Sequence, residues 1–300
     1  MRFSRCPKLP RPVPLGGENQ MLQVKFYGVR GSISVSGPNY IEFGGNTTCI
    51  QIMASDSQRI GIIDAGTGIR KLGQDFLKMQ TKQTEIFIAF THFHWDHIQG
   101  FPFFAPAYDS KFNIKVLAKG GSNEYKQLRD IFAAQMQDTF FPVSLEEMGA
   151  RFDFMLLDNN SQVFTPPDGI PVRITAVKHN HPGGAYSYRY DRDGHSVVFC
   201  TDIEHGQSID ENIVALARNA DILIHDGNYA NDELLSRRGW GHSSYEQAAE
   251  VAIRANAKQL VITHHDPDHD DAFLRMAEKR CREIVPNSIF AREGMVLPTN

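Results

Sequence analysis

Short apolar runs bounded by polar or turn-forming residues recur along most of this chain and predict β-strands. Runs of this length, closed at both ends, are typical of buried strands. We expect strands near residues 22–28, 48–54, 59–64, 85–90, 113–117, 172–178, 185–190, 196–201, 221–225 and 259–263. Helices are expected near residues 68–79, 123–137, 210–218, 243–255 and 271–282. Strands and helices alternate in two clusters, one on each side of residues 92–97, and this alternation predicts an α/β fold.

Residues 101–156 interrupt this alternation and are rich in aromatic side chains. The aromatic residues that stand out in the segment are Phe101, Phe103, Phe104, Tyr108, Phe132, Phe140 and Phe141. We expect a helical insertion, and two interpretations of it remain open. It is either an ordinary insertion with a small core of its own, or a lid that covers a functional edge of the fold and contacts the substrate.

Length, charge and the start of the chain narrow the class of protein. Three hundred residues suit one large α/β domain or two smaller ones, and the net charge of −4 does not indicate a broad nucleic-acid-binding surface. No apolar run reaches the roughly 18 residues that span a membrane. Residues 1–20 are polar and proline-rich, so we expect a disordered leader rather than a secretory signal, followed by a single domain over residues 21–300.

Cysteine usage bears on both the compartment and the kind of metal site. Cys6, Cys49, Cys200 and Cys281 lie far apart and form no C-x-x-C pair. This spacing argues against a structural zinc site built from thiolates and fits a reducing compartment, so we expect a cytoplasmic protein. Cys200 would point to the same side of an extended run as Asp202, two residues later. We expect a buried core thiol there, with a ligand role as the alternative.

The densest group of metal-capable residues is the segment Thr91-His92-Phe93-His94-Trp95-Asp96-His97. In extended backbone His92 and His94 point to one face, whereas Asp96 and His97 can face a second point. Imidazole suits zinc and related transition metals, and a carboxylate can join or bridge such ions. The segment therefore predicts a site for two metal ions, with the first two histidines on one ion and Asp96 and His97 on the other. The alternative is a polar loop whose histidines bind no metal.

The remaining histidines point to further ligands for the same site. All twelve histidines of the chain lie between residues 92 and 269. Three later apolar runs also end in residues that can bind a metal. His179 and His181 follow the run at 172–177, Asp202 follows 196–201, and His264 and His265 follow 259–263. Functional residues at strand ends are typical of a rigid scaffold that presents a site at one edge.

With these residues in place, the chain resembles the metallo-β-lactamase superfamily of metallohydrolases. The resemblance runs from about Met21 to the C-terminus and rests on the His-x-His-x-Asp-His motif, followed in order by a lone His, a lone Asp and a late His. Within the superfamily, the chain looks most like a bacterial subgroup of the ribonuclease Z and phosphodiesterase branch. The match to the branch is carried by Ala220–Asp226, Gly241–Ser244 and Leu260–His264. The match to the bacterial subgroup is carried by the opening segments Phe26–Ser32, Gly44–Cys49 and Asp64–Gly68. The resemblance implies a four-layer αβ/βα sandwich, which is compatible with the predicted elements.

The resemblance also implies a set of seven metal ligands. One ion would take His92, His94 and His181, the other would take Asp96, His97 and His264, and Asp202 would bridge both. Two divalent ions are therefore expected, with Zn²⁺ favoured and Mn²⁺ as the alternative.

Two of these assignments choose between neighbouring histidines. His181 is preferred to His179 because the residues after it resemble the family's His-Pro loop. His264 is preferred to His265 because the family's ligand directly follows the threonine at the end of the strand. His269 is expected to be an exposed turn residue.

Hydrolysis of a phosphodiester also needs a group that protonates the leaving oxygen. His242 is the candidate, because the serines after it start a helix with a capping pattern that includes a Glu at the third position. Asp226, where ribonuclease Z carries Glu, would orient His242, and Asp96 is counted as catalytic as well as a ligand. Asp64 is expected to orient a ligand histidine. The alternatives are a surface cap residue for His242 and a solvated strand end or a partner of a ligand histidine for Asp226.

Three classes of function compete. Two adjacent metal ions suit phosphodiester hydrolysis because they generate a hydroxide at neutral pH and clamp both oxygens of an in-line displacement. The favoured function is a phosphodiesterase for a cyclic nucleotide or another small cyclic phosphate. A tRNA 3′-end endonuclease like ribonuclease Z is less favoured because the long basic arm of that family is missing. A thioester or lactam hydrolase, or a non-hydrolytic domain, would not need His242. The expected partners are a small phosphodiester and, as the resemblance implies, a second copy of the chain, rather than a membrane or an extended nucleic acid.

Overall fold

A computed structural model describes residues 21–54, 59–78, 84–119, 128–157, 159–165 and 169–299 of the chain. The leader expected over residues 1–20 lies outside these ranges. Among the described residues, no helix has the length and apolar character needed to cross a lipid bilayer.

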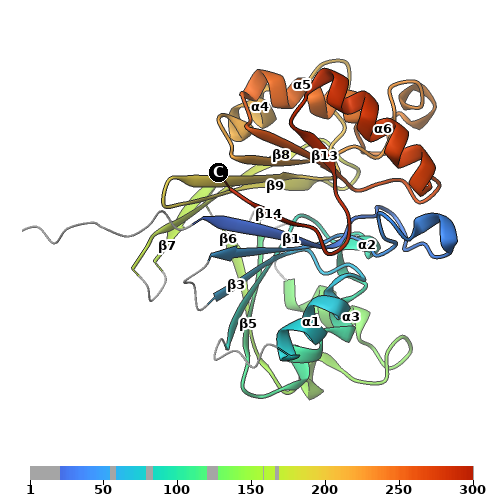
Figure 1. Cartoon of the computed structure of the whole chain (residues 1–300). Helices are drawn as coiled ribbons and strands as arrows, with labels where there is room; N and C mark the ends of the chain where they lie inside the picture. Colours follow the sequence, from blue (N-terminus) through green and yellow to red (C-terminus); the bar gives the residue numbers. More distant parts are fainter. Residues whose placement is uncertain are drawn as a thin grey trace, which may run out of the picture.

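Two seven-stranded sheets form the centre of the molecule (Figure 1). The first sheet contains, in spatial order, β14 (Val296–Pro298), β1 (Leu22–Gly28), β2 (Cys49–Ala54), β3 (Arg59–Ile63), β4 (Glu85–Phe90), β5 (Asn113–Lys119) and β6 (Arg151–Leu157). The second contains, in spatial order, β13 (Ser288–Phe290), β12 (Gln259–Thr263), β11 (Ile222–Asp226), β10 (His195–Cys200), β9 (Ala185–Arg192), β8 (Val172–His179) and β7 (Ser161–Phe164).

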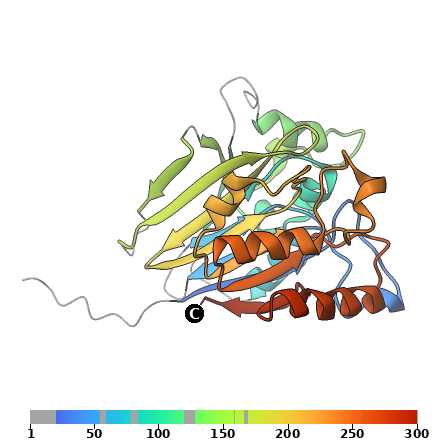
Figure 2. The same cartoon turned by 90° about the horizontal axis from the view of Figure 1, so that it is seen from above.

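Helices cover the outer face of each sheet. The α-helices are α1 (Ile69–Lys78), α2 (Trp95–Ile98), α3 (Leu128–Gln135), α4 (Glu211–Ala217), α5 (Tyr245–Ala255) and α6 (Asp271–Ile284). The short 3-10 helices are η1 (Pro38–Tyr40), η2 (Phe101–Phe103), η3 (Ala105–Tyr108), η4 (Leu145–Glu147) and η5 (Leu234–Arg237). Figure 1 shows α1 and α3 below the first sheet, and Figure 2 shows α5 and α6 side by side over the second. The predicted four-layer αβ/βα sandwich is confirmed.

The alternation of side chains along the strands builds separate cores on the two faces of each sheet. In β4, Ile86, Ile88 and Phe90 are buried and belong to the core beneath the first sheet, together with residues of α1 and α3. Successive side chains of a strand point to opposite faces, and Phe87 accordingly packs toward the second sheet. A third core, which includes Phe26 and Phe199, lies between the two sheets.

Strand direction explains where a site can form. Strands β3 to β6 are parallel in the first sheet, and β10 to β13 are parallel in the second. Strand β8 also runs parallel to β10, because both pair antiparallel with β9. Within each sheet, the carboxyl ends of these strands therefore share one edge, which is where open α/β sheets bind their ligands. In Figure 1 this edge lies beside α2.

The segment at residues 101–156, expected as a helical insertion, is helical only in part. It supplies β5 and β6 to the first sheet and carries α3 and three 3-10 helices between and before them. Phe101, Phe104 and Phe132 are fully buried in the same core as β4, so they do not form a separate core or meet a substrate. Phe103 and Phe140 are exposed. The interpretation as a lid therefore stays open for exposed aromatic side chains such as these.

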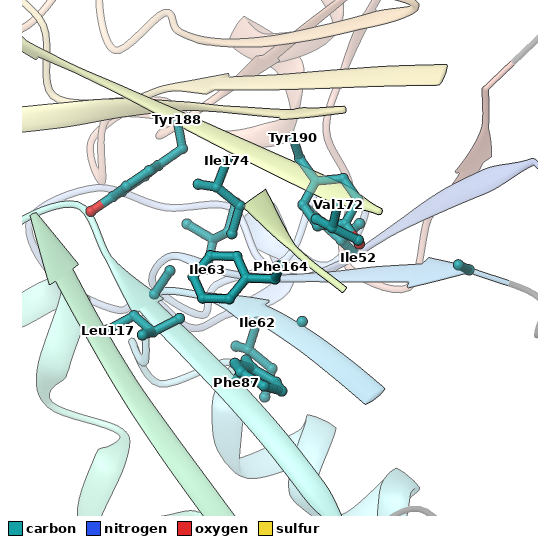
Figure 3. A pocket seen from close by; sticks show the side chains of 13 residues that line it. Ile52, Ile62, Ile63, Phe87, Leu117, Phe164, Val172, Ile174, Tyr188 and Tyr190 are labelled. Atoms are coloured by element: carbon teal, nitrogen blue, oxygen red, sulfur yellow. The ribbon is translucent and has the colours of Figure 1, made fainter. Parts of the chain in front are cut away.

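An apolar cavity of about 90 Å³ lies between the two sheets. Figure 3 shows Ile62 and Phe87 of the first sheet on one side of it, and Ile174 and Tyr190 of the second on the other. The lining is dominated by aliphatic and aromatic side chains of the strands. The described lining residues include no His, Asp, Glu or Cys, so this cavity offers no ligand set for a metal ion.

Candidate metal centre

The structure brings the seven predicted ligands together in two adjacent groups. The first group consists of His92, His94 and His181, and the second of Asp96, His97, Asp202 and His264. Within each group, one ligand-type atom from every residue lies within 4.8 Å of the others. This division agrees with the predicted assignment to two ions, and the role of these residues as ligands stays a prediction.

Each group is assembled by the ends of strands. His92 and His94 follow β4, and the single turn of α2 then places Asp96 and His97 in buried positions. His94 precedes that turn in extended backbone, with φ −65° and ψ 154°. The other three residues come from the second sheet, where His181 follows β8, Asp202 follows β10 and His264 follows β12 directly. The two ions would therefore lie where the two sheets meet.

Three residues at these strand ends adopt left-handed backbone. Asp64 after β3, Asp202 after β10 and His264 after β12 have φ values of 60°, 60° and 61°. This region costs residues with a side chain roughly 1 kcal/mol or more, although Asp and His tolerate it better than most. Such conformations persist where the surrounding structure fixes them, and they cluster at functional sites.

Asp202 lies between the two groups. Its Oδ2 is 3.2 Å from Nε2 of His97, and its Oδ1 is 3.3 Å from Nε2 of His264. The same Oδ1 lies 3.9 Å from Nε2 of His92 and 3.9 Å from Nε2 of His181. One carboxylate thus faces both groups, as the predicted bridging role requires.

Hydrogen bonds behind the rings fix how His92 and His97 point. Nδ1 of His97 lies 2.8 Å from Oδ2 of Asp64, which also accepts from Oγ1 of Thr91 at 3.0 Å. The Thr91 hydroxyl is 3.0 Å from Nδ1 of His92 as well. With Nδ1 engaged behind the ring, the Nε2 atom is the one directed at the centre. Asp64 therefore lies where the sequence predicted a residue that orients a ligand histidine.

Other supports of the site were missed by sequence reasoning. The backbone N–H of Ser32 donates to Oδ2 of Asp96 at 2.9 Å, and the Asn228 amide donates to the carbonyl of His264 at 2.8 Å. Nδ1 of His181 donates to the carbonyl of Gly241 at 2.8 Å. Gly241 has φ 89°, and a Cβ there would lie 2.2 Å from Nδ1 of His181. The glycine is visible in the sequence, but the reason for it is a contact 60 residues away.

Electrostatics and unmet hydrogen bonds test whether cations fit this centre. Burial would raise the pKa of Asp202, but the surrounding histidines hold it well below its usual value. Burial and the neighbouring His97 lower the pKa of His92 well below its usual value. Nε2 of His92 is buried without a hydrogen-bond partner among the described residues, and Oδ2 of Asp202 has there only its ion pair with Nε2 of His97 at 3.2 Å. An ionised carboxylate and a neutral imidazole with a free lone pair are the forms that bind metals, so the donor set fits divalent ions.

The protonation of His97 leads to the same conclusion. Burial alone would lower its pKa, but three carboxylates, led by that of Asp202, raise it well above its usual value. In the absence of ions, a proton on His97 thus offsets the negative charge of the buried carboxylates. Divalent ions would supply this positive charge instead.

His242 and Asp226 form a pair next to the second group. Nδ1 of His242 lies 3.0 Å from Oδ2 of Asp226, and its ring stacks on that of His264 with centroids 5.1 Å apart. Asp226 is fully buried and also accepts from the backbone N–H groups of Asp202 and Asn228. The shorter Asp therefore reaches His242, and it is not a solvated strand end.

The helix start behind His242 differs slightly from the expected pattern. Ser244 caps α5 by accepting from the backbone N–H of Gln247 at 3.1 Å, and the Gln247 side chain accepts from the backbone N–H of Ser244 at 3.2 Å. The capping box thus lies one residue later than a box closed by Glu246. It still holds His242 two residues before the N-cap of α5.

The proton-holding capacity of His242 follows from its surroundings. Burial would lower its pKa, but the carboxylates of Asp226 and Asp202 outweigh this and raise it to about 9. The side chain is about 10 % exposed, which does not suit a surface cap residue. Asp226, His242 and His264 also satisfy the geometry of a possible metal group, so a ligand role for His242 is the alternative to proton donation.

The histidines that the sequence set aside have other partners. Nε2 of His179 donates to the carbonyl of Asp202 at 3.1 Å, and its Nδ1 accepts from the Ser187 hydroxyl at 2.9 Å. Nε2 of His265 donates to the carbonyl of Ala291 at 3.0 Å. These contacts agree with the preference for His181 and His264 as the ligands.

The environments of His269 and Cys200 were also predicted from the sequence. His269 was expected to be exposed, but this expectation is wrong: it is buried, with Nε2 2.9 Å from Oε1 of Glu233 and its ring stacked on Phe273. The turn that carries it packs against the segment near η5, which no local pattern indicates. Cys200 is fully buried and lies outside the metal-capable groups found among the described residues.

A four-layer αβ/βα sandwich with clustered histidines and aspartates at the carboxyl ends of its strands defines the class of metallo-β-lactamase-fold metallohydrolases. The pattern of the β-lactamase superfamily domain matches residues 59–265. The chain belongs to this superfamily, and the resemblance stated from its motifs is confirmed.

Individual relatives support the same branch. Ribonuclease Z of Prochlorococcus marinus (strain MIT 9515) is 23% identical over 308 residues, an alignment that covers 83% of this chain and 92% of that protein. The metallo-β-lactamase fold protein YhfI from Bacillus subtilis superimposes with a TM-score of 0.69 at 18% identity, covering 93% of this chain and 99% of that one. Human tRNase Z, short form, gives a TM-score of 0.64 at 20% identity, with coverage of 93% and 99%. At these identities the solved structures establish the fold.

Proposed function

We propose that the chain hydrolyses small phosphodiesters at a centre of two divalent metal ions, with Zn²⁺ favoured over Mn²⁺. The observation that carries this proposal is the Asp226–His242 pair, held at 3.0 Å beside the two groups of ligand-type residues. A proton donor next to a dinuclear centre is what the cleavage of a phosphodiester with a poor leaving group needs.

The predicted ligands would divide between the two ions. His92, His94 and His181 would hold one, Asp96, His97 and His264 would hold the other, and Asp202 would contact both. When bound, two such ions supply positive charge to the phosphate oxygens and acidify a water molecule that becomes the nucleophile.

The residues around His242 define the direction of proton transfer. Asp226 accepts the Nδ1–H of His242, so the proton available for transfer is on Nε2. During hydrolysis the bond between phosphorus and the leaving oxygen breaks, and this proton ends on the leaving oxygen. Asp226 keeps the ring oriented and stabilises its charged form, in the manner of a carboxylate behind an imidazole. Asp96 would act through the ion that it holds.

The proposed substrate is a cyclic nucleotide or a related small phosphodiester. An enzyme that grips RNA gains affinity from many phosphate contacts, and the chain carries a net charge of −4 without a basic arm. A tRNA 3′-end endonuclease is the second candidate, because the relative from Prochlorococcus marinus bears the name ribonuclease Z. A cytoplasmic homodimer is part of the same proposal, and light scattering of the purified chain would test the dimer.

A substrate panel tests the proposal. The purified chain, loaded with Zn²⁺ or Mn²⁺, is given bis-p-nitrophenyl phosphate, cyclic mononucleotides, a cyclic dinucleotide, a precursor tRNA, a thioester and a lactam. We expect hydrolysis of the small diesters to monoesters, with rates that depend weakly on salt. The Asp202→Ala variant is the matched control for contaminating activity.

Two outcomes would overturn the proposal in different ways. Efficient cleavage of precursor tRNA, with the small cyclic substrates untouched, would establish the endonuclease instead. Hydrolysis of thioesters or lactams without any phosphodiesterase activity would remove the proposed class altogether.

A further inference from the structure

A second cavity, of about 220 Å³, opens beside His242. Its polar lining comes from the loop after β10, from the segment around η5 and from the first turn of α5. The lining includes Glu204, Asn231, Arg237, Arg238, His242 and Gln247. His242 is thus shared between this cavity and the candidate metal centre.

Arg237 is held in this cavity by aromatic rings. The centre of its guanidinium lies 4.9 Å from the ring centroid of Trp240 and 5.8 Å from that of Tyr229. Its Nε is buried and has no hydrogen-bond partner among the described residues. A stacked guanidinium keeps the edge with its N–H groups free, and this edge matches the oxygens of a carboxylate or phosphate.

Among the described residues that line this cavity, Glu204 is the only carboxylate, and backbone N–H groups already donate to it. Both oxygens of Glu204 lie within 3.0 Å of the Gly239 N–H, and Oε2 also accepts from the Gly241 N–H at 2.9 Å. Glu204 therefore shapes the loop that leads to Gly241, and its one negative charge is outnumbered by two arginines in the lining. The guanidinium groups of Arg237 and Arg238 leave the cavity with an excess of positive charge.

We propose that this cavity receives the leaving group of the substrate and that Arg237 binds an anionic substituent on it. The inference rests on the proposed function, because it takes His242 as the donor of a proton to the leaving oxygen. A donor must touch that oxygen, so the leaving group has to lie on the side of His242, where this cavity opens. Water adds its oxygen to phosphorus, the P–O bond breaks, and the proton from His242 completes the alcohol of the leaving group.

This placement narrows the substrate class. The preferred substrate is a small phosphodiester whose leaving group carries a phosphate or carboxylate of its own. Among cyclic nucleotides, a cyclic dinucleotide meets this condition because its second phosphate stays with the leaving side. A cyclic mononucleotide has one phosphate, which remains at the metal ions.

The test compares two substrates that differ by one charge. Methyl 4-nitrophenyl phosphate and methyl 3-carboxy-4-nitrophenyl phosphate share the same reacting centre, and the second carries a carboxylate on its leaving group. The metal-loaded full chain should show a kcat/KM about tenfold or more higher for the carboxylate, the effect of one charge-assisted hydrogen-bonded pair. Arg237→Gln should bring the ratio to about one. Because the readout is a ratio, a loss shared by both substrates cancels.

Control variants separate the role of Arg237 from general effects. Arg151→Gln removes an exposed guanidinium on β6 and should keep the ratio of the native chain. Arg237→Lys keeps the charge without the planar fork, so it should give an intermediate ratio, and it serves if the Gln variant does not fold. The preference for cyclic di-GMP over cyclic GMP should likewise decrease from the native chain to Arg237→Lys and then to Arg237→Gln.

The outcomes distinguish this inference from the proposed function. If both nitrophenyl esters are hydrolysed at a ratio near one, the inference is overturned and the phosphodiesterase stands. An unchanged preference in Arg237→Gln would likewise overturn it. If neither ester is hydrolysed while the metal content is normal, the proposed function falls, and the inference falls with it.

Discussion

His242 is the residue whose replacement tests the proposed chemistry most directly. Its position is fixed by Asp226 and by the cap of α5. It belongs to neither of the two predicted ligand sets. His242→Ala should therefore retain both ions and lower kcat by about 10²-fold or more, the scale of general acid catalysis. The loss should shrink for p-nitrophenolate, because a good leaving group needs little protonation.

Two comparisons make the His242 result interpretable. His195→Ala removes a buried histidine at the start of β10, the opposite end of that strand from Asp202, and should leave the rate unchanged. An equal loss on good and poor leaving groups would refute the role of general acid. Loss of an ion in His242→Ala would identify His242 as a ligand, as its grouping with Asp226 and His264 allows.

Asp202 and His94 should differ in how many ions their loss removes. Asp202 faces both groups, with histidine nitrogens of the two groups within 3.9 Å of its carboxylate oxygens, whereas His94 belongs to the first group alone. Asp202→Ala should therefore lose both ions, and His94→Ala should lose mainly one. Elemental analysis after dialysis against a metal-free buffer measures the metal content per chain. A full single ion in Asp202→Ala would make Asp202 a ligand of one ion only.

At the scale of single residues, the sequence predicted which side chains gather at the candidate centre, but not the residues that hold them in place. The spacing of residues 92–97 predicted that the side chains of this segment gather, whereas the choice of His181, Asp202 and His264 came from the family resemblance. The hydrogen bond from Ser32 to Asp96 and that from Asn228 to His264 join residues 64 and 36 positions apart. Contacts of this kind depend on how the loops pack, and no local pattern encodes them. The same holds for the buried contacts of His269.

At the scale of elements, the ten expected strands are present and the missed ones lie at the edges or ends of sheets. β13 and β14 have three residues each, and β7 has four half-exposed or exposed residues. β6, the edge of the first sheet, is mostly half-buried. A strand so short, or so weakly divided between a buried and an exposed face, lacks the periodicity on which a prediction depends. Only pairing with a neighbour identifies it.

The buried and exposed aromatic residues of segment 101–156 should respond differently to truncation. Phe132 is fully buried, with its ring centroid 4.5 Å from that of Phe101 and 5.0 Å from that of Phe90. Phe132→Ala should lower the free energy of unfolding by about 3–5 kcal/mol, the cost of a large cavity in a core. Phe140 is 70% exposed, and Phe140→Ala should change it by about 0.5 kcal/mol or less.

Urea denaturation of the metal-free forms measures both variants. Equal losses would mean that the segment forms a unit separate from the core of the first sheet. An increase of KM in Phe140→Ala, without a change in metal content, would support the lid that the sequence left open.

At the scale of the whole molecule, the centre joins the two halves. The first sheet supplies His92, His94, Asp96 and His97, and the second supplies His181, Asp202 and His264. These residues were assigned to one site because their order along the chain resembles that of the family. Their meeting in space could not be predicted from any local pattern, because it depends on how two seven-stranded sheets pack face to face.

This architecture predicts that the ions stabilise the entire fold. A ligand that binds only the folded chain stabilises it by about 4 kcal/mol at a thousand times its Kd. The unfolded chain has no such centre, because the predicted ligands come from segments as far apart as residues 92 and 264. Ions bound by the predicted ligands would also supply the positive charge that a proton on His97 otherwise provides beside the buried carboxylates. Removing them with a chelator should therefore lower the Tm, and a stoichiometric excess of Zn²⁺ should restore it.

The Asp202→Ala variant separates this effect from binding of Zn²⁺ elsewhere on the surface. Without the carboxylate that faces both groups, its Tm should stay nearly constant as Zn²⁺ is added, whereas that of the native chain rises. Differential scanning calorimetry of both proteins, with and without chelator, makes the comparison. The Tm of the native chain could stay unchanged with chelator, although elemental analysis shows that the ions have left. That result would mean that the packing between the two sheets alone sets the stability. In that case the centre would be an addition to a scaffold that is complete without it.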